Sequence, residues 1–191
     1  MTLDRNRLHR RSIRLPTYDY RSAGAYFVTI VTADRTCLFD DPRLSTLAER
    51  CWLAMPRHFA HVALDAWVLM PNHLHGVVVF QTGPVDYADN DAPRRTSVQR
   101  GSLGAVVGNF KSVSTRRING LRRTPAVRVW QRNYYERVIR DEAELRRVRD
   151  YIAVNPLRWA LDRENPERSD CADDWTPVED DWFGRCAPDG S

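Results

Sequence analysis

Two histidines in one apolar segment are the residues of this sequence best placed to do chemistry. His73 and His75 lie in the run VLMPNHLHGVVVF, residues 68–80, which is rich in β-branched residues. In a β-strand residues i and i+2 point to one face, so the two imidazoles project side by side while Leu74 points the opposite way, into the core. Such a pair forms half of a metal site, although two polar residues beside a turn are the simpler alternative.

A predicted helix farther along the chain offers the missing ligand. Tyr151 and Asn155 are four residues apart and are therefore neighbours on one edge of a helix. Placed over the sheet face that carries the histidines, the Asn155 carboxamide oxygen would complete a site of two nitrogens and one oxygen, with the Tyr151 phenol beside the metal. This arrangement suits phosphate chemistry. Weaker candidates, which form no zinc signature with the pair, are His9, His58 and His61.

The chain separates its charges by region. Its 191 residues carry a formal net charge of +4, yet no Asp or Glu occurs between Asp91 and Glu136, where arginines accumulate. Such a stretch favours contact with a phosphate backbone, although a solvated face in an arginine-rich protein would show the same pattern. The aromatic pair within WQRNYYER suits stacking on unpaired bases, with packing between strands as the alternative. We predict DNA contacts from Lys111, Arg116, Arg117, Arg132, Tyr134 and Tyr135.

Strands are predicted where β-branched and aromatic residues accumulate, over residues 25–32, 61–70, 73–80, 127–130 and 136–139. The second and third runs are separated by Pro71-Asn72, the pattern of a hairpin with a tight connection. This turn puts His73 at the start of its strand.

Three helices are predicted from apolar residues at helical spacing and from their end signals. The first covers residues 41–55 and ends at Pro56, and Ser102 caps the second. The third begins with an Asp-x-x-Glu capping box at Asp141 and ends at about Asn155, because a proline follows.

The order of these elements, β-α-β-β-α-β followed by one further helix, predicts an α+β fold. We expect a ferredoxin-like sandwich, in which an antiparallel β-sheet carries helices on one face. The other face is left open for a site, and an extra C-terminal helix, the catalytic one, brings Tyr151 and Asn155 to it.

One domain with appended segments accounts for the length of the chain. We expect a basic N-terminal arm over residues 1–20, the domain over 21–160 with a flexible loop at 81–101, and an acidic tail over 161–191. No run approaches the roughly 18 apolar residues of a membrane span, and the scattered cysteines form no C-x-x-C pair. These features predict a cytoplasmic protein with reduced cysteines and no membrane partner.

Three segments resemble one family of DNA-processing enzymes. They are MPNHLHGVVV (70–79), VWQRNYYERVIRDEAEL (129–145) and DYIAVNPLRW (150–159). Together they are similar to the single-tyrosine HUH transposases of bacterial insertion sequences, and most of all to the REP-associated tyrosine transposases, a domesticated branch. HUH denotes two histidines separated by one hydrophobic residue, as in His73-Leu74-His75. The resemblance covers about residues 20–159.

The resemblance implies a metal, a nucleophile and a substrate. His73 and His75 would bind a divalent metal, Mg²⁺ or Mn²⁺, with Asn155 in a third-ligand place that is often Gln in the insertion-sequence enzymes. Tyr151 would attack DNA to give a 5′-phosphotyrosine and a free 3′-hydroxyl. The implied partner is single-stranded DNA with hairpin ends or repeats, and the implied assembly is a homodimer or a monomer.

Two other functions stay open at the level of the sequence. A DNA-binding protein could keep this fold without strand transfer, and a metal-dependent hydrolase could use the same ligands on a small substrate. By residue type alone, Tyr134 and Tyr135 are rival nucleophiles. A covalent protein–DNA adduct that requires Tyr151 distinguishes the transposase from each alternative.

Overall fold

The computed structural model describes residues 18–81, 101–161 and 165 of the chain. The predictions for the N-terminal arm, the loop at 81–101 and the acidic tail concern residues that lie almost entirely outside this part. Among the described residues, no helix combines the length and the apolarity needed to cross a membrane.

The described residues form an antiparallel sheet of four strands. In their order across the sheet these are β2 (Val62–Met70), β3 (His73–Phe80), β1 (Gly24–Val31) and β4 (Tyr135–Ile139). Every neighbouring pair is antiparallel, and the central strands β1 and β3 pair over their full length. Two β-α-β units joined in this order give the ferredoxin-like α+β fold that the sequence predicts.

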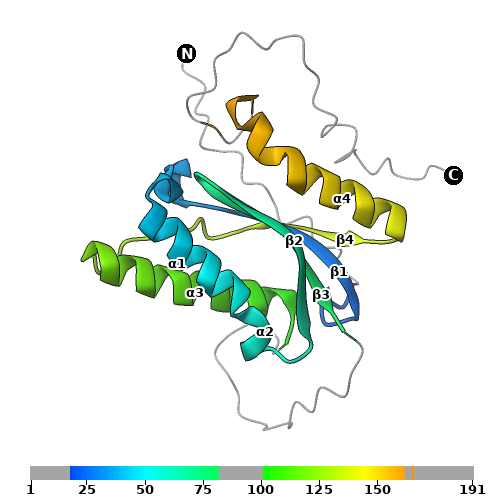
Figure 1. Ribbon diagram of the computed structural model, residues 1–191. Helices are drawn as coiled ribbons and strands as arrows, with labels where there is room; N and C mark the ends of the chain where they lie inside the picture. The colour runs from blue at the N-terminus through cyan, green and yellow to red at the C-terminus, as the bar shows by residue number, and fades with distance from the viewer. Residues whose placement is uncertain (1–17, 82–100, 162–164, 166–191) are drawn as a thin grey trace, which may run out of the picture.

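Helices cover both faces of the sheet (Figure 1). On one face lie α1 (Pro42–Leu53) and α3 (Leu103–Arg122), whereas α4 (Glu142–Val154) crosses the other. The shorter helical segments are α2 (Met55–His58) and the 3₁₀ turns η2 (Ala33–Arg35), η3 (Leu38–Asp40) and η4 (Asn155–Leu161). The C-terminal helix therefore lies over the face that the other two long helices leave open, as predicted.

The two predicted helix caps are present. The Ser102 hydroxyl accepts from the backbone N–H of Ala105 at 3.3 Å, and the Asp141 carboxylate accepts from that of Glu144 at 2.7 Å. Each bond satisfies one of the N–H groups that the first turn of a helix leaves without a partner. The residues around each helix start are therefore enough to indicate where both helices begin.

Two local predictions are wrong. Residues 127–130 form no strand. Of these four residues only Trp130 pairs with another segment, through a single isolated bridge to Thr32. The indole of Trp130 is buried and donates its N–H to Ser114 at 2.9 Å. The apolar residue at this position therefore anchors a connecting segment to the core and does not belong to a strand. Pro56 does not end a helical run but lies in the first turn of α2, where its missing N–H has no partner to lose.

The larger core lies between the sheet and helices α1 and α3. There Trp52 of α1 and Phe110 of α3 are fully buried and meet edge to face, with ring centroids 5.3 Å apart. β3 meets Trp52 with Gly76, where an added Cβ would lie 2.5 Å from the indole ring. Glycine at this position therefore allows α1 to approach the sheet closely.

The core beneath α4 is smaller. Its buried members, two from the helix and three from the sheet, are Val148, Ile152, Phe27, Val77 and Ile139. The histidine-bearing part of β3 borders this cluster, since the ring of Phe27 stacks on that of His75 with centroids 5.5 Å apart. The candidate site and the small core thus share one face of the sheet.

Candidate active site

The two histidines of β3 lie side by side on the face that α4 covers. Both side chains are buried, and their Nε2 atoms are 3.0 Å apart. Leu74 between them lies in the larger core on the opposite face. The alternation expected of a strand is present, and it brings two imidazole nitrogens to one point.

A chain of hydrogen bonds fixes the tautomer of His73. Asn72 donates its Nδ2–H to the backbone carbonyl of Arg35 at 3.1 Å, which leaves its Oδ1 facing Nδ1 of His73 at 2.8 Å. A carboxamide oxygen only accepts, so Nδ1 of His73 carries the proton and Nε2 presents a bare lone pair. On the neighbouring ring, Nδ1 of His75 lies 2.8 Å from the hydroxyl of Thr29.

Burial keeps both imidazoles neutral. It lowers the pKa of His73 to about 3, and the positive charge of Arg35 contributes to this shift. Burial also lowers the pKa of His75 well below its usual value, with a smaller contribution from His73. Neutral imidazole is the form that binds a metal ion, so at pH 7 both rings are in the state that a metal site requires.

The Tyr151 hydroxyl reaches the same point from α4. It lies 3.1 Å from Nε2 of His75, and its ring meets those of His75 and Phe27 edge to face, with centroids 5.1 and 6.0 Å away. A nucleophile must lie within hydrogen-bond reach of the groups that activate it. The helix thus places the phenol next to the imidazole pair, as the spacing of the sequence predicts.

Asn155 follows one turn after Tyr151 and begins η4. Its side chain is buried, and its Oδ1 has no hydrogen-bond partner among the described residues. Leaving a buried acceptor unpaired costs about 1–3 kcal/mol, and this oxygen is therefore available to bind a ligand. Trp159 of the same turn lies over His73, with 5.9 Å between the ring centroids.

The spacing of the two Nε2 atoms fits a divalent cation with ligands at right angles. Two ligand atoms about 2.1 Å from a metal and at right angles to each other are about 3.0 Å apart. This separation matches the 3.0 Å between the two Nε2 atoms. The described part of the chain contains no cluster of three His, Cys, Asp or Glu side chains, so a third protein ligand here would be a neutral oxygen.

The weaker histidine candidates do not join the pair. His61 lies at the other end of the β2–β3 hairpin, where its Nε2 is 3.0 Å from the carbonyl oxygen of Gly101 and its ring packs against Phe80. His58 is exposed at the end of α2. His9 lies outside the described residues.

Lys111 contacts the segment that leads into β4. Its ammonium group donates to the carbonyls of Arg132 and Asn133 at 3.1 and 3.2 Å, and it lies 5.5 Å from the centre of the Tyr134 ring. Burial lowers the pKa of Lys111 to about 8. The residue therefore orders this segment, and any contact with DNA would be made in addition to that role.

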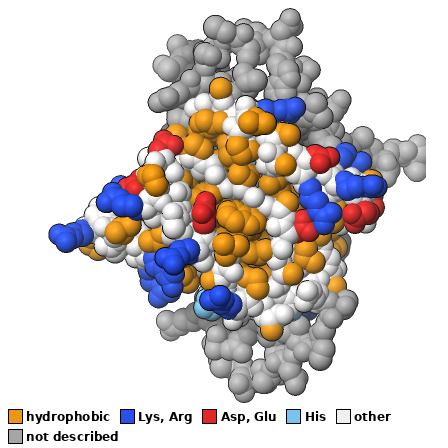
Figure 2. All heavy atoms as spheres, viewed as in Figure 1, with side chains coloured by type: hydrophobic (Ala, Val, Ile, Leu, Met, Phe, Trp, Pro, Cys, Tyr) orange, Lys and Arg blue, Asp and Glu red, His pale blue; other side chains and the backbone are white. Residues whose placement is uncertain are grey.

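The predicted DNA-contacting arginines, Arg116, Arg117 and Arg132, are exposed. Figure 2 shows Lys and Arg side chains gathered at the left, over the C-terminal part of α3, and apolar side chains along the middle, over the edge strand β2. The two tyrosines differ in their surroundings. Tyr134 packs against the larger core, whereas Tyr135 lies under α4 with its ring 6.2 Å from that of Phe27.

Sequence reasoning missed the residues that orient the histidines: Thr29, Asn72 and Arg35. Asn72 could have been found, because a carboxamide next to a candidate histidine ligand often orients its ring. Thr29 lies beside His75 only because β1 pairs with β3, and Arg35 reaches Asn72 from the turn η2 that follows β1. Arg35 and the preceding Asp34 adopt left-handed backbone conformations, with φ of 55° and 53°, and this turn presents the Arg35 carbonyl to Asn72.

Several known proteins are similar to this chain, although no protein-family model matches its sequence. An uncharacterized protein of Haemophilus influenzae is 36% identical over 171 residues, which cover 81% of this chain and 92% of that protein. A second protein of the same organism, named as a REP-associated tyrosine transposase, is 28% identical over 143 residues, 73% of this chain and 74% of its own length. The solved structure of a REP-associated tyrosine transposase bound to a REP hairpin has a similar fold, with a TM-score of 0.55 at 18% identity over 76% of this chain and 74% of that one.

Proposed function

We propose, from the premise that this chain belongs to the family of REP-associated tyrosine transposases, that it cleaves and rejoins single-stranded DNA through Tyr151 in a metal-dependent reaction. The observation that carries this proposal is the 3.1 Å distance between the Tyr151 hydroxyl and Nε2 of His75. This distance supports the proposal because it brings a phenol next to one of two buried, neutral imidazoles.

Tyr151 would act as the nucleophile. Its phenol oxygen attacks the scissile phosphorus, so that a bond from the tyrosine oxygen to phosphorus forms as the bond from phosphorus to the 3′-oxygen breaks. The phenol gives up its proton, and the departing 3′-oxygen takes one up. The products are a 5′-phosphotyrosine and a free 3′-hydroxyl, and a second 3′-hydroxyl can reverse the step and rejoin the strands without ATP.

His73, His75 and Asn155 are the residues that would hold a divalent cation, through two imidazole nitrogens and one carboxamide oxygen. Bound there, Mg²⁺ or Mn²⁺ would polarise the scissile phosphate and offset the charge that develops on its oxygens. Because the ligands are neutral, they leave the full charge of the cation to act on the phosphate. Imidazole ligands are uncommon for Mg²⁺, so we expect Mn²⁺ to support the reaction at least as well.

The DNA would be single-stranded and associated with a hairpin. The similar solved structure is of a REP-associated tyrosine transposase bound to a REP hairpin, and we infer the same class of ligand for this chain. Arg116, Arg117 and Arg132 are exposed and could contact the phosphates of such a ligand. A base next to the cleaved bond would have to be unpaired to reach a phenol held over a sheet.

The decisive experiment looks for a covalent adduct. Labelled oligonucleotides made from the inverted repeats flanking the gene are incubated with the protein and Mn²⁺, and adducts that resist SDS are separated on a gel. We expect an adduct with the wild-type protein and with Tyr135→Phe, the matched control for a neighbouring tyrosine. We expect none with Tyr151→Phe.

The other outcomes identify the alternatives. Binding of the hairpin without any adduct from the wild-type protein would indicate a DNA-binding protein that lacks strand transfer. Metal-dependent cleavage that survives Tyr151→Phe would indicate a hydrolase. An adduct of equal yield from Tyr151→Phe would refute Tyr151 as the nucleophile.

A further inference from the structure

An ion pair ties α4 to the edge strand β2 close to Tyr151. We propose that the pair of Arg149 and Asp65 is a positioning device, which sets the helix so that the Tyr151 hydroxyl reaches His75. As a statement about catalysis this inference rests on the proposed function. The role of the ion pair in positioning the hydroxyl is inferred from the geometry of the helix alone.

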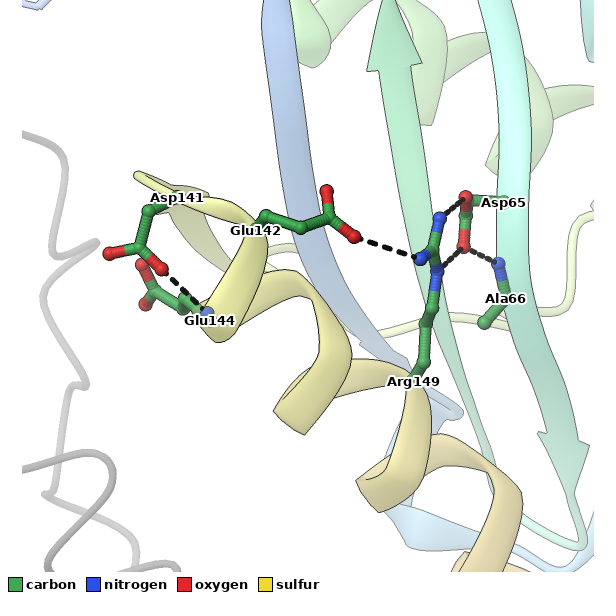
Figure 3. A network of polar contacts seen from close by, with 6 residues as sticks. All are labelled: Asp65, Ala66, Asp141, Glu142, Glu144 and Arg149. Carbon is green, nitrogen blue, oxygen red and sulfur yellow. Dashed lines mark hydrogen bonds and ion pairs between the residues drawn. The ribbon is translucent and has the colours of Figure 1, made fainter.

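The contact between Arg149 and Asp65 is directional (Figure 3). Nε of Arg149 donates to Oδ1 of Asp65 at 2.8 Å, and Nη2 donates to Oδ2 at 2.7 Å. Nη1 lies 3.5 Å from the carboxylate of Glu142 in the first turn of the same helix. A two-pronged bond between a planar guanidinium and a carboxylate fixes orientation as well as distance.

A bulge in β2 aims Asp65 at the helix. Leu64 pairs with Val78 and Trp67 with Gly76, so that Asp65 and Ala66 together stand opposite one residue of β3. Leu64 and Trp67 pack on the larger core, whereas Ala66 packs beneath α4. Two successive residues therefore point to the α4 face, which a regular strand does not allow. The backbone N–H of Ala66 also donates to Oδ1 of Asp65 at 2.6 Å and orients the carboxylate.

A second ion pair holds α4 at the opposite edge of the sheet. Glu144 is buried, and its carboxylate accepts from Nε of Arg137 on β4 at 2.7 Å and from the backbone N–H of Arg140 at 2.9 Å. The strands β2 and β4 are the two edges of the sheet. The helix is thus attached at both edges, and its first turn is already fixed by Glu144.

The pair of Arg149 and Asp65 fixes the rotation of the helix nearer to the site. At 100° per residue, Arg149 and Tyr151 project about 80° to either side of the buried stripe formed by Val148 and Ile152. Burial of that stripe depends on apolar area and not on direction, so it fixes the rotation of the helix less strictly than a two-pronged ion pair does. The same rotation would part Arg149 from Asp65 and move the Tyr151 hydroxyl away from His75, and a displacement of 1 Å can slow a positioned reaction about 100-fold.

The test compares two arginines of the same helix. The rate of adduct formation is measured at saturating hairpin DNA with Mn²⁺ for Arg149→Ala, Asp65→Ala and Arg146→Ala, since Arg146 is exposed and its loss changes the charge equally. We expect Arg149→Ala and Asp65→Ala to lower the rate about 10- to 100-fold. Arg146→Ala should leave the rate unchanged, and the affinity for DNA should be the same in both arginine variants.

Restoration of the pair separates positioning from packing. In the double variant Asp65→Arg with Arg149→Asp the charges are exchanged, and we expect at least a tenfold recovery of the rate over either single charge reversal. Arg149→Lys keeps the charge but loses the two-pronged geometry, and its rate should fall between those of the wild-type protein and Arg149→Ala. Equal rates for Arg149→Ala and Arg146→Ala, or no recovery in the exchanged pair, would overturn the proposal.

A measurement without DNA or metal keeps this proposal distinct from the proposed function. The ¹⁵N chemical shift of Nε2 of His75 reports the hydrogen-bond contact between this atom and the Tyr151 hydroxyl, and Tyr151→Phe gives the value of the shift when that contact is absent. We expect Arg149→Ala to move the shift towards the Tyr151→Phe value and Arg146→Ala to leave it in place. If the wild-type protein forms no adduct, the proposed function fails, while these spectra still decide whether Arg149 positions the hydroxyl. A wild-type shift in Arg149→Ala would reject the positioning role.

Discussion

The strand β3 meets two different environments on its two faces. Towards α1 and α3 it presents Leu74 and Gly76 to a core built around large aromatic side chains. Towards α4 it presents His73 and His75, beside a small apolar cluster and within reach of a phenol. The larger core and the candidate site therefore lie on opposite faces of one sheet. Substitutions on the face of α1 and α3 should therefore change mainly the stability of the protein, and substitutions on the α4 face mainly the proposed reaction.

The largest expected effect on folding is on the face of α1 and α3. Trp52→Ala removes a fully buried indole that packs against Phe110 and Gly76, and it should lower the free energy of unfolding by about 3–5 kcal/mol, as measured by urea denaturation. At a temperature where the variant is still folded, the yield of adduct per folded molecule should match that of the wild-type protein. A specific loss of adduct from folded Trp52→Ala would show that the two faces are not independent.

Metal binding should stabilise the protein through the other face. Mn²⁺ at 100 times its dissociation constant should raise the free energy of unfolding by about 2.7 kcal/mol, and EDTA should reverse this effect. Thermal unfolding in the presence and absence of Mn²⁺ measures it. The stabilisation should be absent in His75→Gln and retained in His61→Gln, because His61 lies away from the pair. Equal stabilisation of both variants would place the metal elsewhere.

Lowering the pH should destabilise the folded protein through the buried histidines of the α4 face before it protonates the carboxylates. The folded state holds the pKa of His73 at about 3, below the ordinary value of 6.5, so the unfolded chain binds more protons as the pH falls below 6.5. Stability is therefore complete above pH 6.5 and is lost progressively towards pH 3. Between pH 7 and 5 this residue accounts for a loss of about 2 kcal/mol, and His75 acts in the same direction.

Urea denaturation at pH 7 and pH 5 measures this loss, and His73→Gln is the matching variant. The carboxylates with lowered pKa, such as those of Asp41 and Asp65, have ordinary values near 3.8 and titrate below this range. We expect a smaller loss of stability between the two pH values in His73→Gln. Identical losses in variant and wild type would show that the imidazole of His73 takes up protons readily while buried.

The smallest expected effect compares the two helix caps. Ser102→Ala and Asp141→Ala each remove one bond to a first-turn N–H, and each should lower the free energy of unfolding by about 1 kcal/mol. The rate of adduct formation should fall only for Asp141→Ala, because this cap starts the helix that carries Tyr151. Equal slowing by both variants would show that the start of α3 affects the reaction as much as the start of α4, contrary to the separation of the two faces.

Local rules were enough to predict much of this fold. Ser102 and Asp141 are recognisable caps, and the alternation in His73-Leu74-His75 follows from strand geometry whatever the partners of the strand are. The order of strands and helices then favoured a ferredoxin-like sheet, and the spacing of Tyr151 and Asn155 gave the edge of the helix that faces the site. Each of these features depends on residues within a few positions of one another.

The parts of the molecule that the sequence did not reveal depend on distant contacts. Asp65 and Arg149 are 84 positions apart, and each resembles an ordinary surface charge until the bulge in β2 and the crossing of α4 bring them together. Trp130 was misread because an apolar residue that anchors a connection has the same pattern as one in a strand. Such roles are set by tertiary packing, which overrides local preference.

The bulge in β2 has a consequence for the behaviour of the protein at high concentration. β2 is a long, mostly apolar strand at the edge of the sheet, the type of element on which a strand from another molecule can add and begin aggregation. The irregularity at Asp65 and Ala66 interrupts the regular spacing of backbone groups along that edge, and Asp65 adds a carboxylate to it. We therefore expect the irregularity that directs Asp65 towards α4 also to hinder edge-to-edge association of folded molecules.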